Sequence, residues 1–394
     1  MRAVTWQGRG EVEVTDVPDP KIQEPTDIVV KVTSTAICGS DLHLIGPLTP
    51  FMTPGDVLGH EAMGIVEEVG SEVGRLRPGD RVVVPFNISC GHCFMCTHGL
   101  QSQCETTQVR EHGCGAALFG YTKLYGQVPG GQAEYVRVPQ AQYGPVKLPE
   151  TATDDRWLFL SDILPTAWQA VKYADLAEGE TIAVFGLGPV GQLATRSALK
   201  QGAARVIGVD LVPERLAEAA RHGVEVIDAS ATDDVPAAIR DATNGRGADR
   251  VVDAVGMEAH GSPVAEAAAA TITTLPRPVA AAMEQTIGVD RLAALRDALA
   301  SVRRGGTVSI AGVYGGAADP FNMMRLFDRQ VTIRMGQANV RRWTDELFGM
   351  LYDNEDVFGV ETLASHHLPL EDAPDAYRKF QAKQDGYMKV VLRP

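Results

Sequence analysis

The sequence predicts an α/β protein with two domains: a compact β-rich domain and a doubly wound domain built on a parallel sheet. With 394 residues, the chain is long for a single hydrophobic core. Short apolar stretches broken by Gly and Pro fill residues 1–150, as in a β-rich domain. From Thr181 to Met335, strand-like and helix-like stretches alternate, which is typical of a parallel sheet with helices on both faces.

The elements can be followed in order. DIVVKVTSTAI, MGIVEEVG, DRVVVPF and AEYVRVP are expected strands of the first domain, and PTAWQAVKYADL is helical in period. We expect the first domain at 1–163, the second at 164–336, and a return of 337–394 to the first. An Ala-, Thr- and Pro-rich segment at 257–288 interrupts the alternation, so we interpret it as an insertion.

Composition excludes several classes of protein. Lys and Arg number 36 against 50 Asp and Glu, a formal charge of −14. A nucleic-acid or anionic-membrane surface is therefore not expected, because binding phosphate requires a basic face. The N-terminus lacks the apolar core of a signal peptide, and no apolar run is long enough to span a bilayer. We expect a cytoplasmic protein with reduced thiols.

Four of the six cysteines lie within sixteen residues, spaced C-x2-C-x2-C-x7-C. In a reducing compartment such spacing favours a metal over disulfides. An iron–sulfur cluster is less suited, since the ferredoxin spacing is missing, and scattered buried thiols would not cluster in this way. We predict a closed structural zinc site in a lobe at about 87–115, with Cys114 an ordinary thiol. The predicted ligands are Cys90, Cys93, Cys96 and Cys104.

A glycine-rich loop lies between an apolar strand, TIAVF, and a helical segment. G-x-G-x-x-G in this context predicts a dinucleotide-binding Rossmann domain, whose glycines let the backbone approach a pyrophosphate at a helix N-terminus. The predicted cofactor-binding residues of the loop are Gly186, Gly188, Pro189, Val190 and Gly191.

Asp210 ends the next expected strand, about 20 residues beyond the loop, where a carboxylate can hold both ribose hydroxyls. It would repel a 2′-phosphate, so NAD is favoured over NADP. Arg215 is the nearest cation and a candidate for assisting the ribose; a solvated helix residue is the alternative interpretation.

A second group of metal-binding residue types comprises Cys38, His60, Glu61 and Asp162. One Cys, one His and one carboxylate would give zinc three protein ligands and leave a position open for chemistry. Taken singly, Cys38 could be a buried thiol, His60 a core histidine and Asp162 a cap on the following helix.

The motifs CGSDLH, GHE, the four-cysteine lobe and GLGPVG stand in an order that resembles the zinc-dependent medium-chain dehydrogenases/reductases, the alcohol dehydrogenase superfamily. The resemblance implies a GroES-like catalytic domain in which Cys38 and His60 bind catalytic zinc. Many members use a second Cys as third ligand, where this chain offers Asp162. The chain most resembles the glutathione-independent formaldehyde dehydrogenase and dismutase branch. The features that carry this resemblance are Asp162 in place of the Cys, the stretch GGQAEYVRVP and the insertion.

The same resemblance implies roles for neighbouring residues. Ser40 and His43 match a relay that carries the substrate proton to solvent. Glu61 matches a carboxylate that can approach the metal during ligand exchange. Phe86 matches a wall of the substrate pocket, and Lys389 a cation near the cofactor pyrophosphate.

We therefore expect an enzyme with one catalytic and one structural zinc per chain. It would transfer hydride between NAD and a small alcohol or hydrated aldehyde, such as formaldehyde. The alternatives are a secondary-alcohol or polyol dehydrogenase, a formaldehyde dismutase with tightly bound NAD, and a non-catalytic NAD-binding protein. The family suggests a homodimer or homotetramer. The insertion is expected to cover the adenosine half of NAD or to form a subunit interface.

Overall fold

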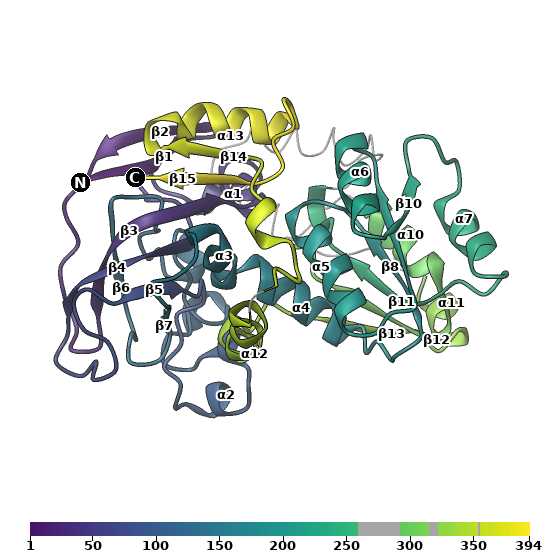
Figure 1. Ribbon diagram of the computed structural model, residues 1–394, viewed down its shortest axis with the longest axis horizontal. Helices are drawn as coiled ribbons and strands as arrows, with labels where there is room; N and C mark the ends of the chain where they lie inside the picture. The colour runs from purple at the N-terminus through teal and green to yellow at the C-terminus, as the bar shows by residue number, and fades with distance from the viewer. Residues whose placement is uncertain (259–291, 315–321, 354) are drawn as a thin grey trace. The chain divides into compact units, whose positions relative to one another are not determined.

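The computed structural model describes residues 1–258, 292–314, 322–353 and 355–394 (Figure 1). They form two compact units, which we call the first unit (Met1–Pro165 with Ala338–Pro394) and the second unit (Thr166–Gln337). These bounds lie within two residues of those expected from the sequence. Beyond Glu258, the expected insertion at 257–288 lies outside the described residues. No described helix has the length and apolar character needed to cross a membrane.

The first unit is built on a seven-stranded sheet in the order β14-β15-β3-β4-β5-β7, with β6 paired to β3. β15, from the C-terminal part of the chain, pairs antiparallel with β3, so that Val390 lies opposite Ile37. A separate hairpin is formed by β1 and β2. The strand bounds are β1 (Arg2–Gly8), β2 (Glu11–Asp16), β3 (Ile28–Ile37), β4 (Glu61–Val69), β5 (Arg81–Val84), β6 (Tyr135–Val138), β7 (Val146–Lys147), β14 (His366–Pro369) and β15 (Val390–Arg393).

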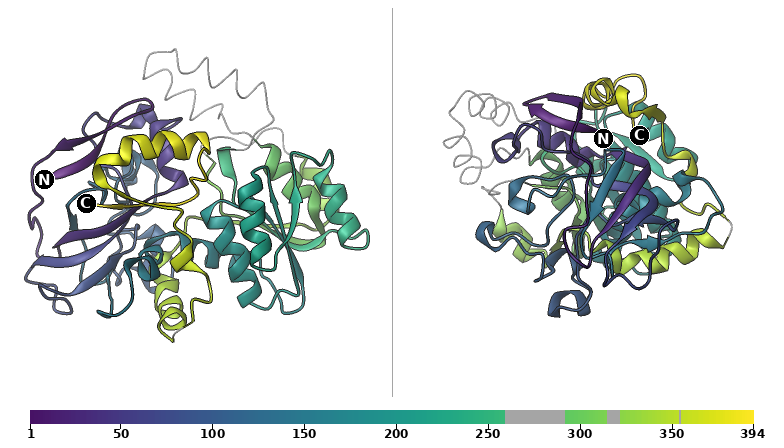
Figure 2. Two further views of the ribbon diagram at one scale, coloured as in Figure 1. Left: turned by 45° about the horizontal axis from the view of Figure 1, so that its top comes forward. Right: turned by 90° about the vertical axis from the view of Figure 1, so that its left-hand side faces the viewer.

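Helix α13 lies along this unit and packs on β2 (Figure 2). Its apolar side chains, including Tyr377 and Phe380, join Trp6 and Leu392 in one buried cluster. The return of the C-terminal segment therefore contributes part of the first unit's core. The helix bounds of the first unit are α1 (Gly39–Ile45), α2 (Phe94–Thr97), α3 (Asp154–Leu158), α12 (Val340–Tyr352) and α13 (Ala373–Ala382). Helix α4 (Ile163–Tyr173) begins in the first unit and continues into the second.

The second unit contains a six-stranded sheet in the order β10-β9-β8-β11-β12-β13, and every pairing is parallel. Helices α7 and α10 pack against the sheet face that carries Phe185 and Val209, while α5 and α6 contact β8, β9 and β10. The predicted doubly wound arrangement is confirmed. The bounds are β8 (Thr181–Phe185), α5 (Pro189–Lys200), β9 (Arg205–Asp210), α6 (Pro213–Arg221), β10 (Glu225–Asp228), α7 (Val235–Ala242), β11 (Ala248–Asp253), α10 (Ala293–Ser301), β12 (Val302–Ile310), α11 (Met323–Asp328) and β13 (Thr332–Met335).

Asp154, at the start of α3, ties that helix to the first unit's sheet. Its carboxylate accepts hydrogen bonds from the hydroxyls of Thr33 and Ser34, both at 2.7 Å, and pairs with Arg81 at 2.5 Å. Burial opposes ionisation, but these three donors outweigh it and lower the pKa of Asp154. The carboxylate thus stabilises the folded state in its charged form.

We expect Asp154→Asn to lower the free energy of unfolding by about 1–3 kcal/mol at pH 7, because it weakens charge-assisted hydrogen bonds. A carboxyl whose folded pKa is depressed contributes stability above its unfolded pKa of about 4 and loses that contribution as the pH falls through its folded pKa. The deficit of the variant relative to the wild type should therefore shrink below about pH 4. Urea denaturation of both proteins across pH 3–7 checks this. A deficit that is equal at every pH would contradict it.

Candidate metal centres and nucleotide loop

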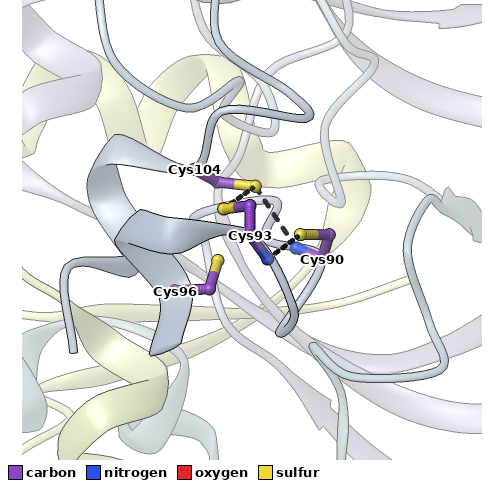
Figure 3. A group of neighbouring side chains, drawn as sticks. All are labelled: Cys90, Cys93, Cys96 and Cys104. Carbon is purple, nitrogen blue, oxygen red and sulfur yellow. Dashed lines mark hydrogen bonds between the residues drawn. The ribbon is translucent and has the colours of Figure 1, made fainter. Parts of the chain in front are cut away.

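The four clustered cysteines converge in the first unit (Figure 3). Their sulfur atoms all lie within 4.8 Å of one another, and no disulfide joins them. Backbone N–H groups point at the sulfurs: Cys90 N donates to Cys104 Sγ at 3.3 Å, and Cys93 N to Cys90 Sγ at 3.4 Å. Four sulfurs at this separation suit the tetrahedral coordination of zinc.

The contact between Cys96 and Cys104 favours a thiolate at Cys104 and raises the pKa of Cys96. The pKa of Cys104 is lowered to about 3, first because the Cys96 thiol donates to its sulfur and further because backbone N–H groups of Cys90 and Thr107 do so. A thiolate is the form that binds metal. Cys114 lies outside the group, and burial raises the pKa of its thiol. The lobe therefore has the donor set of a closed zinc site.

Cys38, His60, Glu61 and Asp162 form the second group, with ligand atoms within 4.8 Å of one another. Cys38 lies between β3 and α1, His60 directly precedes β4, and Asp162 lies in the turn before α4. Asp162 Oδ2 is 3.2 Å from His60 Nε2 and 3.7 Å from Cys38 Sγ. The fold thus brings together residues that are far apart in the sequence.

This second group gathers acidic side chains and a histidine in the protein interior. All four residues are buried, and burial raises the pKa of both the Cys38 thiol and the Glu61 carboxyl. Glu61 Oε2 has no hydrogen-bond partner among the described residues. A buried cluster of acceptors costs free energy unless a cation compensates it, so the donor set fits a zinc ion.

Lys389, the cation expected near the cofactor pyrophosphate, lies beside the second group within the first unit. Its side chain is fully buried in the first unit, where Nζ lies 2.6 Å from Glu61 Oε1 and donates to the Ile37 carbonyl at 3.1 Å. The structure therefore places Lys389 as the buried partner of Glu61. The physical reason is that β15 pairs with β3 and carries the preceding residue into the core.

Asp41, which was not singled out from the sequence, contacts His60. Its Oδ1 lies 2.9 Å from His60 Nδ1, and both residues are almost completely buried. Burial by itself lowers the pKa of His60, but the carboxylates of Asp41 and Asp162 raise it well above its usual value. Histidine ligands almost always give their second nitrogen to such an acceptor. The position of Asp41, three residues after Cys38 in CGSDLH, was the available signal.

Ser40 and His43 lie on α1, three residues apart and so on neighbouring positions of one helix face. Ser40 Oγ is 3.3 Å from His60 Nε2 and is half-buried. His43 is buried. The structure thus places Ser40 at the second metal-type group and His43 next along the helix.

Two aromatic rings flank the same group. Phe86, the expected pocket wall, meets the His60 ring edge-on with centroids 5.9 Å apart. Tyr121 does the same at 5.9 Å and was not singled out from the sequence. Their rings confine the space beside His60.

The glycine-rich loop joins β8 to α5 in the second unit. Gly186 has φ +82°, and a Cβ there would lie 2.8 Å from Val255; a Cβ on Gly191 would lie 1.8 Å from the Gly186 carbonyl oxygen. Gly188 caps α5 and is followed by Pro189 at the first helical position, which leaves the helix N-terminus open to an anion. Val190 follows within the first turn.

Asp210 ends β9 beside this loop. Its carboxylate accepts from the backbone N–H of Leu187 at 2.6 Å and from those of Leu211 and Val212 at 2.7 and 2.9 Å. Arg215 Nη1 is 3.7 Å from Asp210 Oδ2, and a Cβ on Gly188 would lie 3.8 Å from the same nitrogen. The expected ribose-binding carboxylate and its cation therefore both lie at the loop.

Comparison with known proteins decides the family. The model described as "Alcohol dehydrogenase GroES-like domain" matches residues 24–150, and the one described as "Zinc-binding dehydrogenase" matches residues 189–273. An uncharacterized zinc-type alcohol dehydrogenase-like protein of Bacillus subtilis is 42% identical across 100% of both chains. The chain belongs to the zinc-type alcohol dehydrogenase family. The superfamily expected from CGSDLH, GHE and GLGPVG is confirmed.

Other relatives of this zinc-type dehydrogenase are similar over nearly their whole length. The glutathione-independent formaldehyde dehydrogenase of Pseudomonas aeruginosa is 36% identical over 97% of this chain and 95% of its own. Among solved structures, alcohol dehydrogenase TADH from Thermus sp. ATN1 is 35% identical, with a TM-score of 0.81 and coverage of 100% and 99%. The 2R,3R-butanediol dehydrogenase of Bacillus subtilis is 25% identical, with a TM-score of 0.73 and coverage of 100% and 99%. The GroES-like and Rossmann domains are confirmed by these matches.

Proposed function

We propose that this alcohol dehydrogenase family member transfers hydride between NAD and a small alcohol or hydrated aldehyde, with formaldehyde as the leading substrate. The observation that carries the proposal is the buried Cys38–His60–Asp162 group with the Ser40 hydroxyl 3.3 Å from His60 Nε2. Binding a dinucleotide alone requires none of these residues, which argues against a non-catalytic NAD-binding protein. The similarity to the Pseudomonas formaldehyde dehydrogenase supports the substrate.

Cys38, His60 and Asp162 would hold the catalytic zinc, and Glu61 has a free oxygen that can approach it. When bound, zinc supplies Lewis acidity that lowers the pKa of a hydroxyl group towards neutrality. Ser40 accepts the substrate hydroxyl proton, and His43, one helical turn on, receives it from Ser40. A bound nicotinamide would supply the hydride acceptor or donor.

Phe86 and Tyr121 limit the substrate to a small one. Each ring stands 5.9 Å from the His60 ring and occupies space beside the metal-binding atoms. An apolar wall excludes water and orients a one- or two-carbon substrate, whereas a longer chain would have to displace a ring.

In the second unit, Gly186 and Gly191 permit the tight turn between β8 and α5, and Gly188 leaves the backbone open for a pyrophosphate at the N-terminus of α5. Asp210 holds the ribose hydroxyls, and its negative charge disfavours a 2′-phosphate. NAD is therefore the proposed cofactor.

Asp210→Ser should raise the ratio of kcat/KM with NADP to kcat/KM with NAD by roughly tenfold or more, since a change of about 1.4 kcal/mol gives tenfold. The substitution removes a charge that repels the 2′-phosphate and frees Arg215, 3.7 Å away, to pair with it. Adding Arg215→Gln as a control should reverse much of the gain. Steady-state kinetics with both cofactors checks this. Equal use of NAD and NADP by the wild type would contradict the role of Asp210.

The test of function is a substrate panel on gel-filtered, zinc-replete protein, with any bound nucleotide first released by acid and quantified. We expect formaldehyde hydrate and NAD⁺ to give formic acid, NADH and a proton without glutathione. Ethanol, 2-propanol and 2,3-butanediol should react with lower kcat/KM.

Other results would select an alternative. Preference for 2,3-butanediol would indicate a secondary-alcohol or polyol dehydrogenase. Formaldehyde turnover to methanol and formate without added NAD, together with acid-released nucleotide, would indicate a dismutase. No turnover of any substrate by protein that binds NAD would contradict an enzymatic function.

We also propose that the chain assembles into a homodimer or homotetramer in the cytoplasm. β13 ends the described sheet of the second unit, and exposed apolar side chains gather on it and on α11. Phe327, for example, is 83% exposed. A second copy could bury these side chains, and light scattering on the eluted protein would measure the assembly. Whether residues 257–288 cover NAD stays a prediction.

A further inference from the structure

Gln132, in the stretch GGQAEYVRV, is fully buried in the first unit and has a hydrogen-bond partner at each end of its side-chain amide. Nε2 donates to the Ala36 carbonyl and to Asp41 Oδ2, both at 3.2 Å. Oε1 accepts from the Tyr377 hydroxyl at 2.8 Å. The amide therefore connects α13 to the residue that faces His60.

These partners allow one orientation of the amide. A carbonyl and a carboxylate only accept, so Ala36 and Asp41 both require the NH₂ end. The Tyr377 hydroxyl then donates to the carbonyl end. Tyr377 is itself 1% exposed and held in the apolar cluster of α13. Its hydroxyl thus opposes a flip of the Gln132 amide.

Gln132 in turn sets the direction of the Asp41 carboxylate. Asp41 Oδ2 accepts from Gln132 Nε2 and from the backbone N–H of Cys38 at 2.9 Å. Oδ1 is left to face His60 Nδ1 at 2.9 Å, and neither atom has another partner among the described residues. Two donors on one oxygen therefore aim the other at the histidine.

The consequence reaches the metal-binding nitrogen. A carboxylate at Nδ1 retains the ring proton there and leaves the Nε2 lone pair free. Nε2 is the atom that faces Asp162 at 3.2 Å and Ser40 at 3.3 Å. The chain of contacts from Tyr377 through Gln132 and Asp41 ends at this lone pair.

The backbone beside His60 is shaped to admit Gln132. Gly59 has φ +95°, and a Cβ there would lie 2.4 Å from Gln132 Cγ and 2.7 Å from its backbone nitrogen. Any side chain at position 59 would displace Gln132. The glycine of the GHE motif thus lets the amide pack directly against the backbone of a metal-binding residue.

We propose that Gln132 and Tyr377 are positioning residues that set the zinc affinity of the Cys38–His60–Asp162 site by holding Asp41 towards His60. The inference rests on the proposed function in one respect: this site must bind zinc. Neither residue touches substrate or metal, and both act through Asp41.

The test is a chelator competition on the full-length, zinc-loaded protein, with zinc release followed for each of its two sites. Gln132→Leu keeps the volume and removes the amide, and we expect it to weaken zinc binding at the Cys38 site about 10–100-fold. Tyr377→Phe should give a smaller loss. The four-cysteine site serves as the internal reference and should keep wild-type affinity. Gln169→Leu, which removes another buried amide, in the second unit, is the matched control and should alter neither site.

Two further readouts separate positioning from general destabilisation. In cobalt-substituted protein, Gln132→Leu should shift the visible bands of the Cys38 site, because the ligand field changes when His60 turns. Since Tyr377 acts through Gln132, adding Tyr377→Phe to Gln132→Leu should cause no further loss of affinity.

The inference would be overturned if Gln132→Leu bound zinc at the Cys38 site within twofold of the wild type. It would also be overturned by an equal loss at both sites, or by a fully additive double variant. Wild-type protein that holds zinc at the four-cysteine site alone would instead overturn the proposed function.

Discussion

Asp162→Ala is expected to leave both units folded while lowering kcat/KM for aldehyde oxidation by at least about a hundredfold. The carboxylate supplies Oδ2, which lies 3.2 Å from His60 Nε2 and 3.7 Å from Cys38 Sγ. Loss of a side chain that hydrogen-bonds a metal ligand typically lowers metal affinity or activity 10–100-fold. Loss of a ligand itself should lower activity by at least the upper end of that range. His60 keeps its pairing with Asp41 Oδ1 at 2.9 Å, so the first unit should remain folded.

Zinc per chain, urea midpoint and steady-state kinetics should be measured together on this variant. Asp155→Ala is the control, because it removes a neighbouring carboxylate that pairs with His367 at 2.8 Å, outside the metal-type groups. That control should keep its zinc. Asp162→Cys supplies a thiolate in place of the carboxylate and should restore zinc binding. Wild-type kinetics and zinc content in Asp162→Ala would show that Asp162 is not a ligand.

The second large effect is expected from Cys93→Ser, which should destabilise the first unit by several kcal/mol and promote aggregation. A structural zinc contributes apparent binding energies of about 10–16 kcal/mol in small zinc-finger peptides, and a hydroxyl is a poor replacement for a thiolate. Apolar packing inside the lobe is small, because its described core cluster adds Ala116 alone to the four cysteines.

Melting temperature, light scattering and zinc content would reveal this loss. Cys114→Ser makes the same chemical change outside the cluster and should alter stability by about 0.5 kcal/mol or less. Extraction of zinc from the lobe of the wild type should reproduce the Cys93→Ser behaviour. A Cys93→Ser protein with wild-type melting temperature and one zinc fewer would mean that the lobe folds without its metal.

The parts that sequence reasoning could predict are local in the chain. Four cysteines within sixteen residues can close a metal site with little help from the rest of the fold, so their spacing was sufficient. The loop from Gly186 to Gly191 is similarly local, because strand, turn and helix follow one another directly. The alternation of strand-like and helix-like stretches along the chain predicted the parallel sheet for the same reason.

The Cys38 site is different, because Asp162 lies 124 residues from Cys38. Spacing alone could not join them, and family resemblance was needed. The contacts around the site join residues that are still farther apart in the sequence: Gln132 and Tyr377 are 245 positions apart, and Glu61 and Lys389 are 328 apart. A lysine in the stretch MKVVLRP gives no local sign of burial. Only the pairing of β15 with β3 determines where it goes.

The pairing of β15 with β3 also determines how late in its synthesis the chain can complete this site. Lys389 leaves the ribosome 352 residues after Ile37, whose carbonyl it binds, an interval of roughly 20–70 seconds at about 5–20 residues per second. During it, Cys38, His60 and Asp162 exist without Tyr377 and Lys389, while the four-cysteine lobe is already complete. We therefore expect the two zinc ions to enter in a fixed order, the structural ion during translation and the catalytic ion after it.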